Sequence, residues 1–204
     1  MIESVENGKK PELTAWHDWT SSDIANSYTA QTDAIFGFRS RWQLAHSFHG
    51  LELSGYVEGS AIPLGYEALF KVDIVCTVAE QLARVIEFPR EKCFLTVEHV
   101  EMADRVRRDL EVYPASRFVE NLRKNARGRA CENLMAFADG SSSDLMYLMR
   151  PLRNGVSHGT STPTGLGLPS NNKKSLHKIE TLLELCQTVL DDCDRQFTEF
   201  VKTH

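Results

Sequence analysis

Three polar side chains in the last third of the chain have the types and the spacing needed to cleave a phosphodiester. Arg153 and Asn154 are adjacent, and His158 follows Asn154 at helical spacing. Arginine offers a phosphate a permanently charged, planar donor group, and histidine is the side chain best suited to moving protons near neutral pH. On a helix, Asn154 and His158 would share one face, with Arg153 beside them. We therefore predict that these three residues form a catalytic site.

The sequence around these residues matches a known pattern. The string from Met149 to Gly159, MRPLRNGVSHG, resembles the signature of the HEPN superfamily, in which an arginine and a polar residue precede a histidine by a short spacer. The resemblance implies a small all-helical domain. Because many HEPN proteins are RNases of toxin–antitoxin or phage-defence systems, it also implies a metal-independent endoribonuclease. Since other members have lost activity, a silent HEPN-like module that binds protein or RNA, or that dimerises, is the alternative.

The chemistry expected of such a site is attack of a ribose 2′-OH on the adjacent phosphorus. His158 would move the proton, Arg153 would stabilise the charge on the phosphate oxygens and Asn154 would orient the reacting group. One histidine cannot easily serve as base and acid in the same step. The HEPN resemblance supplies an answer, because protomers of that family face each other across a two-fold axis. It implies a homodimer with a composite site, RNA as the partner, an antitoxin or defence protein as a further partner, and neither metal nor cofactor.

The same residues also have a purely structural interpretation. Arg153 and Asn154 would hold a bend made by Pro151, and His158 beside Gly159 would end a helix, where a cation suits the helix dipole. Gly155 lies inside the motif, where a helix interior loses about 1 kcal/mol relative to alanine. It indicates a local bend or a close backbone approach.

A local basic stretch is the second candidate for contact with RNA. The chain as a whole carries a formal net charge of −5, which argues against a protein that coats nucleic acid non-specifically. Residues 117–129, however, contain a single acidic side chain, Glu120. A solvated helix face and a phosphate-contacting surface both fit this pattern. The basic residues are Arg117, Arg123, Lys124, Arg127 and Arg129.

The pattern of apolar residues predicts the fold. Spacing of three and four residues predicts helices over residues 22–53, 63–86, 96–113, 115–138, 145–149 and 175–201. Residues 1–13 are predicted to be a flexible tail, and residues 160–172 a loop rich in glycine, proline and polar residues. We expect an all-α, antiparallel helical bundle, HEPN-like with an extra N-terminal helix, as a single domain over residues 14–204.

Other features define the class of protein. The N-terminus has no hydrophobic signal region and no apolar run is long enough to span a bilayer, so we expect a cytoplasmic protein without a membrane segment. The five cysteines form no Cys-x-x-Cys pair, which favours buried, reduced thiols. His46 and His49 would bind a metal only with a carboxylate between them. Trp16, Trp19 and Trp42 would pack on the bundle or stack on bases.

Overall fold

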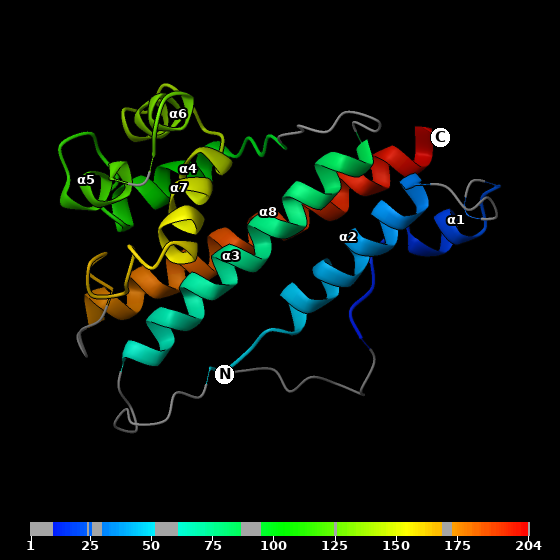
Figure 1. Cartoon of the computed structure of the whole chain (residues 1–204), viewed down its shortest axis with the longest axis horizontal. Coiled ribbons are helices and arrows are strands. Elements are labelled where there is room, and N and C mark those ends of the chain that lie inside the picture. Colours follow the sequence, from blue (N-terminus) through cyan, green and yellow to red (C-terminus); the bar gives the residue numbers. More distant parts are fainter. Residues whose placement is uncertain are drawn as a thin grey trace.

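The computed structural model describes residues 10–23, 25, 30–51, 61–86, 95–124, 126–168 and 173–203. This part of the chain is helical and holds no β-strand, only an isolated antiparallel bridge between Glu98 and Asp144. The protein is therefore an all-α helical bundle (Figure 1). Its helices are α1 (Trp16–Thr20), α2 (Ala30–Ser47), α3 (Ala61–Ile86), α4 (Val100–Asp109), α5 (Arg117–Arg123), α6 (Arg129–Ala138), α7 (Met146–Ser157) and α8 (Lys173–Thr203).

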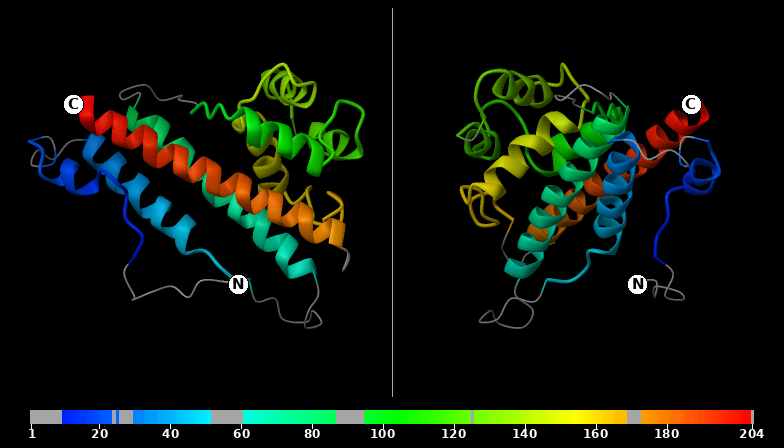
Figure 2. Two further views of the ribbon diagram at one scale, coloured as in Figure 1. Left: turned by 180° about the vertical axis from the view of Figure 1, so that it is seen from behind. Right: turned by 45° about the vertical axis from the view of Figure 1, so that its right-hand side comes forward.

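The frame of the bundle consists of the long helices α2, α3 and α8. Helix α2 packs antiparallel to α3, while α8 runs beside α3 in the same direction (Figures 1 and 2). Helices α4 to α7 lie between α3 and α8 in sequence, and this long connection allows two neighbouring helices to run parallel. The antiparallel arrangement expected of neighbouring helices thus holds for α2 against α3.

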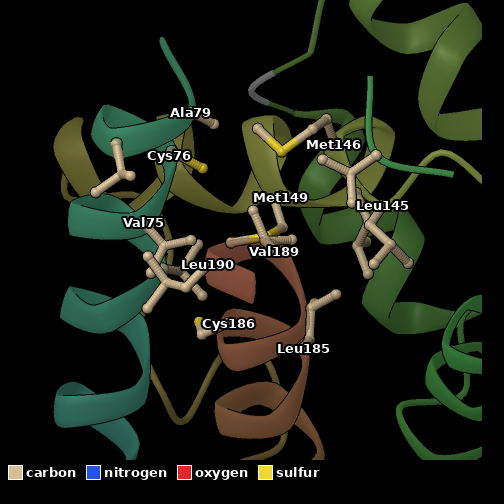
Figure 3. Packing of buried hydrophobic residues seen from close by; sticks show 14 of the residues in the cluster. Val75, Cys76, Ala79, Leu145, Met146, Met149, Leu185, Cys186, Val189 and Leu190 are labelled. Atoms are coloured by element: carbon tan, nitrogen blue, oxygen red, sulfur yellow. The ribbon is translucent and has the colours of Figure 1, made fainter. Parts of the chain in front are cut away.

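The core lies where α3, α7 and α8 meet. Figure 3 shows Val75 of α3, Met149 of α7 and Val189 of α8 in one apolar cluster. Cys76, Cys186 and Cys193 are fully buried free thiols, which confirms the prediction for these three residues. Burial raises the pKa of the Cys186 thiol to about 12, so it packs as a small neutral side chain.

An extended segment before α4 positions the start of α7. The carboxylate of Asp144 accepts hydrogen bonds from the backbone N–H of Val97 and of Met146, both at 3.0 Å. The N–H of Leu145 donates to the carbonyl of Val97 at 2.9 Å. Helix α4 begins only at Val100, because His99 caps it by accepting from the N–H of Met102. The helix predicted to begin at residue 96 therefore begins later.

The prediction of one helix over residues 115–138 is wrong. The structure holds two shorter helices, α5 and α6, separated by a turn that ends at Gly128. Gly128 has φ of +54° and ψ of −132°, a conformation that a residue with a Cβ adopts only with strain. The basic residues of this stretch are consequently spread over two helices and a turn.

Helices α2 and α7 also differ in length from the prediction, each because of contacts at a particular residue. Helix α2 ends at Ser47, not at residue 53, and the buried ammonium of Lys71 donates to the carbonyls of Ala45 and Phe48 at this end. Helix α7 continues through Pro151, where the sequence predicted a short helix and a kink. Leu148 and Leu152 are fully buried on either side of Pro151, and this packing compensates for the lost hydrogen bond.

The N-terminal segment packs against the bundle from Pro11 onward. Leu13 is buried, the carbonyl of Pro11 accepts from Gln43, and Thr14 donates to the carboxylate of Asp194. The tail predicted for residues 1–13 otherwise lies outside the described residues, which begin at residue 10. None of the described helices is sufficiently long and apolar to cross a membrane.

Candidate functional site

Helix α7 carries the predicted motif and presents one polar face away from the core. Its buried side includes Leu148, Met149 and Leu152. On the opposite side, Asn154 and His158 follow one another at helical spacing. Asn154 is half-buried and His158 is exposed. The predicted shared face of Asn154 and His158 is therefore present.

His158 stands at the C-terminal end of this face. Its backbone N–H donates to the carbonyl of Asn154 at 3.1 Å, and Gly159, with φ of +66°, turns the chain away. The side chain of His158 is exposed. Among the described residues the imidazole has no hydrogen-bond partner. Both ring nitrogens are thus open to a substrate or to a partner molecule.

Arg153 points to the other side of α7, toward α3. Its Nη1 donates to Oε1 of Glu80 at 2.7 Å, and its Nε lies 3.4 Å from Oδ1 of Asp73. Oδ1 of Asp73 also accepts from the hydroxyl of Ser157 at 3.1 Å. The Arg153 side chain is 29% exposed, so the pair with Glu80 is accessible to solvent. Two carboxylates therefore already surround the predicted phosphate clamp.

The structure brings only part of the predicted basic stretch to hollows in the surface. Arg117 lines one hollow, and Lys124 lines a neighbouring one where α5 meets the loop that follows His158. Arg129 lines a third hollow, at α7. Arg123 and Arg127 are exposed and line none of these three hollows. The stretch is not one continuous helix face.

The described part of the loop after the motif is folded onto the bundle. Leu166 and Leu168 are buried, and the amide of Asn121 on α5 donates to the carbonyl of Gly165 at 2.6 Å. The carbonyl of Gly155 in α7 accepts from the N–H groups of Thr160 and Ser161. The predicted loop is thus confirmed over residues 160–168, and residues 169–172 lie outside the described residues.

The hollow at α7, here called the α6–α7 cleft, has a volume of about 300 Å³. This volume is at the lower end of the range for small-ligand sites. Most of its residues could not be predicted from the sequence, because their spacing follows no motif. Arg150 of this cleft and Asn154 are four residues apart on α7, so they lie on the same side of the helix. It is lined by Thr96, Arg129, Ala130, Asn133, Asp144, Met146, Tyr147, Arg150 and Pro151.

The electrostatics of the α6–α7 cleft favour a negatively charged ligand. Arg129 is exposed at the start of α6, and Nη2 of Arg150 donates to the carbonyl of Leu95 at 2.9 Å. Asp144 is 2% exposed, and burial raises the pKa of its carboxyl, although two backbone N–H donors oppose this effect. Two guanidinium groups thus face one buried carboxyl group.

His46, predicted as one of two possible metal ligands, packs against an aromatic ring instead. The ring centroids of His46 and Trp42 are 4.0 Å apart, and burial lowers the pKa of the His46 imidazole. Within the described part of the chain, no group of three metal-ligating side chains comes together. Trp19 and Trp42 are buried, so they pack in the bundle and cannot stack on bases.

Comparison with known proteins gives no match: no family model, no curated protein and no solved structure is significantly similar to this chain.

Proposed function

We propose that the protein is a metal-independent endoribonuclease of the HEPN type, in which His158, Asn154 and Arg153 act on the RNA phosphodiester. The observation that carries this proposal is the exposed imidazole of His158 on the same face of α7 as Asn154. A cleft that holds two arginines lies nearer the N-terminal end of the same helix. A side chain that transfers a proton must be exposed enough to form a hydrogen bond with its substrate.

In the proposed reaction the 2′-oxygen of a ribose attacks the adjacent phosphorus, and the bond from phosphorus to the 5′-oxygen breaks. One imidazole accepts the proton of the 2′-OH, and a second donates a proton to the departing 5′-oxygen. The products are a 2′,3′-cyclic phosphate and a 5′-hydroxyl, so no water and no electron transfer is needed in this step. Arg153 would have to leave Glu80 and turn toward the face of Asn154 and His158, where it would stabilise the charge on the non-bridging oxygens.

The need for two imidazoles makes a homodimer part of the proposal. In a two-fold arrangement His158 of each protomer would contribute to one cleft. The exposed position of His158 at the end of α7 is compatible with this arrangement. RNA is the proposed partner, and a toxin or phage-defence role, with an antitoxin or defence protein as regulator, is the setting that the HEPN resemblance implies.

A second candidate is a catalytically silent HEPN-like module that binds protein or RNA. The observation in its favour is that Arg153 forms ion pairs with both Glu80 and Asp73 of its own chain. In this case Arg153 would join α7 to α3, and His158 would only end the helix.

Cleavage of tRNA, rRNA and mRNA pools in excess EDTA distinguishes the two candidates. The nuclease predicts cleavage that is lost in His158→Ala and Arg153→Ala. His17→Ala is the matched control, because His17 is an exposed histidine on α1. If the wild type cleaves none of the RNA pools, the silent module is favoured. Cleavage that survives both substitutions contradicts the assignment of the site.

A further inference from the structure

The α6–α7 cleft combines cationic, aromatic and amide groups on two neighbouring helices. Arg129 and Asn133 belong to α6, and Tyr147 and Arg150 belong to α7. Arg129 and Asn133 are four residues apart and therefore share one face of α6. Residues of α6 and of α7 thus form facing walls of one cleft.

Several polar groups at this cleft are available to a ligand. Arg129 is exposed, and within the described residues the amide of Asn133 and the hydroxyl of Tyr147 have no hydrogen-bond partner. The guanidinium of Arg150 is held in place by the carbonyl of Leu95. The cleft therefore offers charge for a phosphate, an amide for the edge of a base and an aromatic ring for its face.

The position of the cleft relates it to the proposed catalytic residues. Arg150 and His158 are eight residues apart on α7, which corresponds to about 12 Å along the helix axis. The phosphates of a stacked strand advance about 3.4 Å each, so a few nucleotides cover this distance. Asn154 lies between the two residues on the same face of the helix.

We propose that the α6–α7 cleft binds a nucleotide of single-stranded RNA, a short distance along the strand from the phosphodiester at His158. The phosphate lies between Arg129 and Arg150, the base stacks on Tyr147, and the amide of Asn133 contacts the base edge. This inference rests on the proposed ribonuclease function for its choice of ligand, but it assigns residues that take no part in proton transfer. Its role is to hold the strand in register with the motif.

The test is binding of a fluorescein-labelled RNA hexamer in which 2′-fluoro groups replace every 2′-OH, so that it cannot be cleaved by 2′-oxygen attack. Fluorescence anisotropy gives its Kd for the full chain at several salt concentrations. Arg129→Gln should reduce the slope of log Kd against log salt by about 0.7, the value for one lost contact with a single strand. Lys202→Gln, which removes one positive charge from the exposed end of α8 outside the cleft, should change Kd less than about twofold.

Tyr147 provides an independent measurement. Tyr147 also packs against the core, so Tyr147→Leu is chosen to keep the packing while it removes the aromatic face. It should weaken binding about tenfold, within the range for loss of one stacked base, and Tyr147→Phe should retain the wild-type Kd to within about threefold. A circular dichroism melt checks that each variant is folded.

The outcomes separate this inference from the proposed function. Equal effects of Arg129→Gln and Lys202→Gln, an unchanged Kd for Tyr147→Leu, or no binding of the hexamer by the wild type would each overturn the cleft assignment. His158-dependent cleavage with unchanged KM in the cleft variants would leave the nuclease standing without the cleft. Cleft-dependent binding without any cleavage would keep the cleft and remove the nuclease.

Discussion

Arg153 of α7 donates from Nη1 to Oε1 of Glu80 on α3 across 2.7 Å. A guanidinium that already has a carboxylate partner binds a phosphate only in competition with it. The pair therefore decides how Arg153 contributes to the proposed site. Both side chains are about one-third exposed, 29% and 31%, so water and ions screen their attraction.

Neutralising Glu80 should make Arg153 a better phosphate ligand. We expect Glu80→Gln to raise kcat/KM for RNA cleavage by about threefold, a change of under 1 kcal/mol. The free energy of unfolding should fall by at most about 1 kcal/mol, as for other exposed ion pairs. Steady-state cleavage kinetics and urea denaturation give the two numbers.

The control for Glu80 is Glu184→Gln, which removes an exposed carboxylate paired with Arg105 instead. In an Arg153→Ala background, where cleavage is lost, Glu80→Gln should not restore it, because Glu80 acts only through Arg153. A lower kcat/KM for Glu80→Gln would show that Glu80 positions Arg153 productively, contrary to this prediction.

Mixing wild-type and His158→Ala subunits tests the composite site. If each reaction uses both imidazoles of a dimer, an equal mixture of the two subunits should retain about one quarter of the wild-type activity after exchange. Protomers that act alone would retain about one half. Activity is measured at constant total protein, with unmixed wild type at half concentration as the control.

Gly128 should be required for the orientation of α6. Its φ of +54° and ψ of −132° suit only glycine, although no atom would contact an added Cβ. Gly128→Ala should lower the free energy of unfolding by about 1–3 kcal/mol through backbone strain alone. It should also weaken hexamer binding, because Arg129 is the first residue of α6. An unchanged urea midpoint would show that the turn tolerates an L-residue.

The ion pairs of Glu111 predict a dependence of stability on pH. Hydrogen bonds from Lys174 and then Lys178 lower the pKa of Glu111 to about 2, from an ordinary value of 4.5. Because the pKa is lower in the folded state, the stabilisation is present above pH 4.5 and is lost as the pH falls toward 2. In urea denaturation, the free energy of unfolding of Glu111→Gln should depend less on pH over this range than that of the wild type. Identical pH profiles would exclude this role.

The helices that the sequence predicted best are the long, periodic ones. The prediction for residues 63–86 matches α3 to within two residues at its start, and α8 extends two residues beyond each predicted end. Their apolar residues recur over many turns, so the period is well determined. The break at Gly128 was missed, because a single glycine inside an apolar pattern does not reveal its φ in the folded chain.

The candidate site was only partly predictable for a different reason. The shared face of Asn154 and His158 follows from their spacing alone. The contacts of Arg153 depend on Asp73 and Glu80, which are far away in sequence and meet α7 only through packing. The α6–α7 cleft likewise joins Arg129 to Arg150 across a turn that sequence patterns do not place in space.

The most direct test of the central claim is cleavage, in excess EDTA, of one defined RNA and of a copy in which a single 2′-OH, at the cleaved position, is replaced by hydrogen. We predict that the wild type cuts the all-ribose RNA to leave a 2′,3′-cyclic phosphate and leaves the substituted copy intact, and that His158→Ala cuts neither. Cutting of the substituted copy, or cutting by His158→Ala, would contradict 2′-oxygen attack assisted by His158.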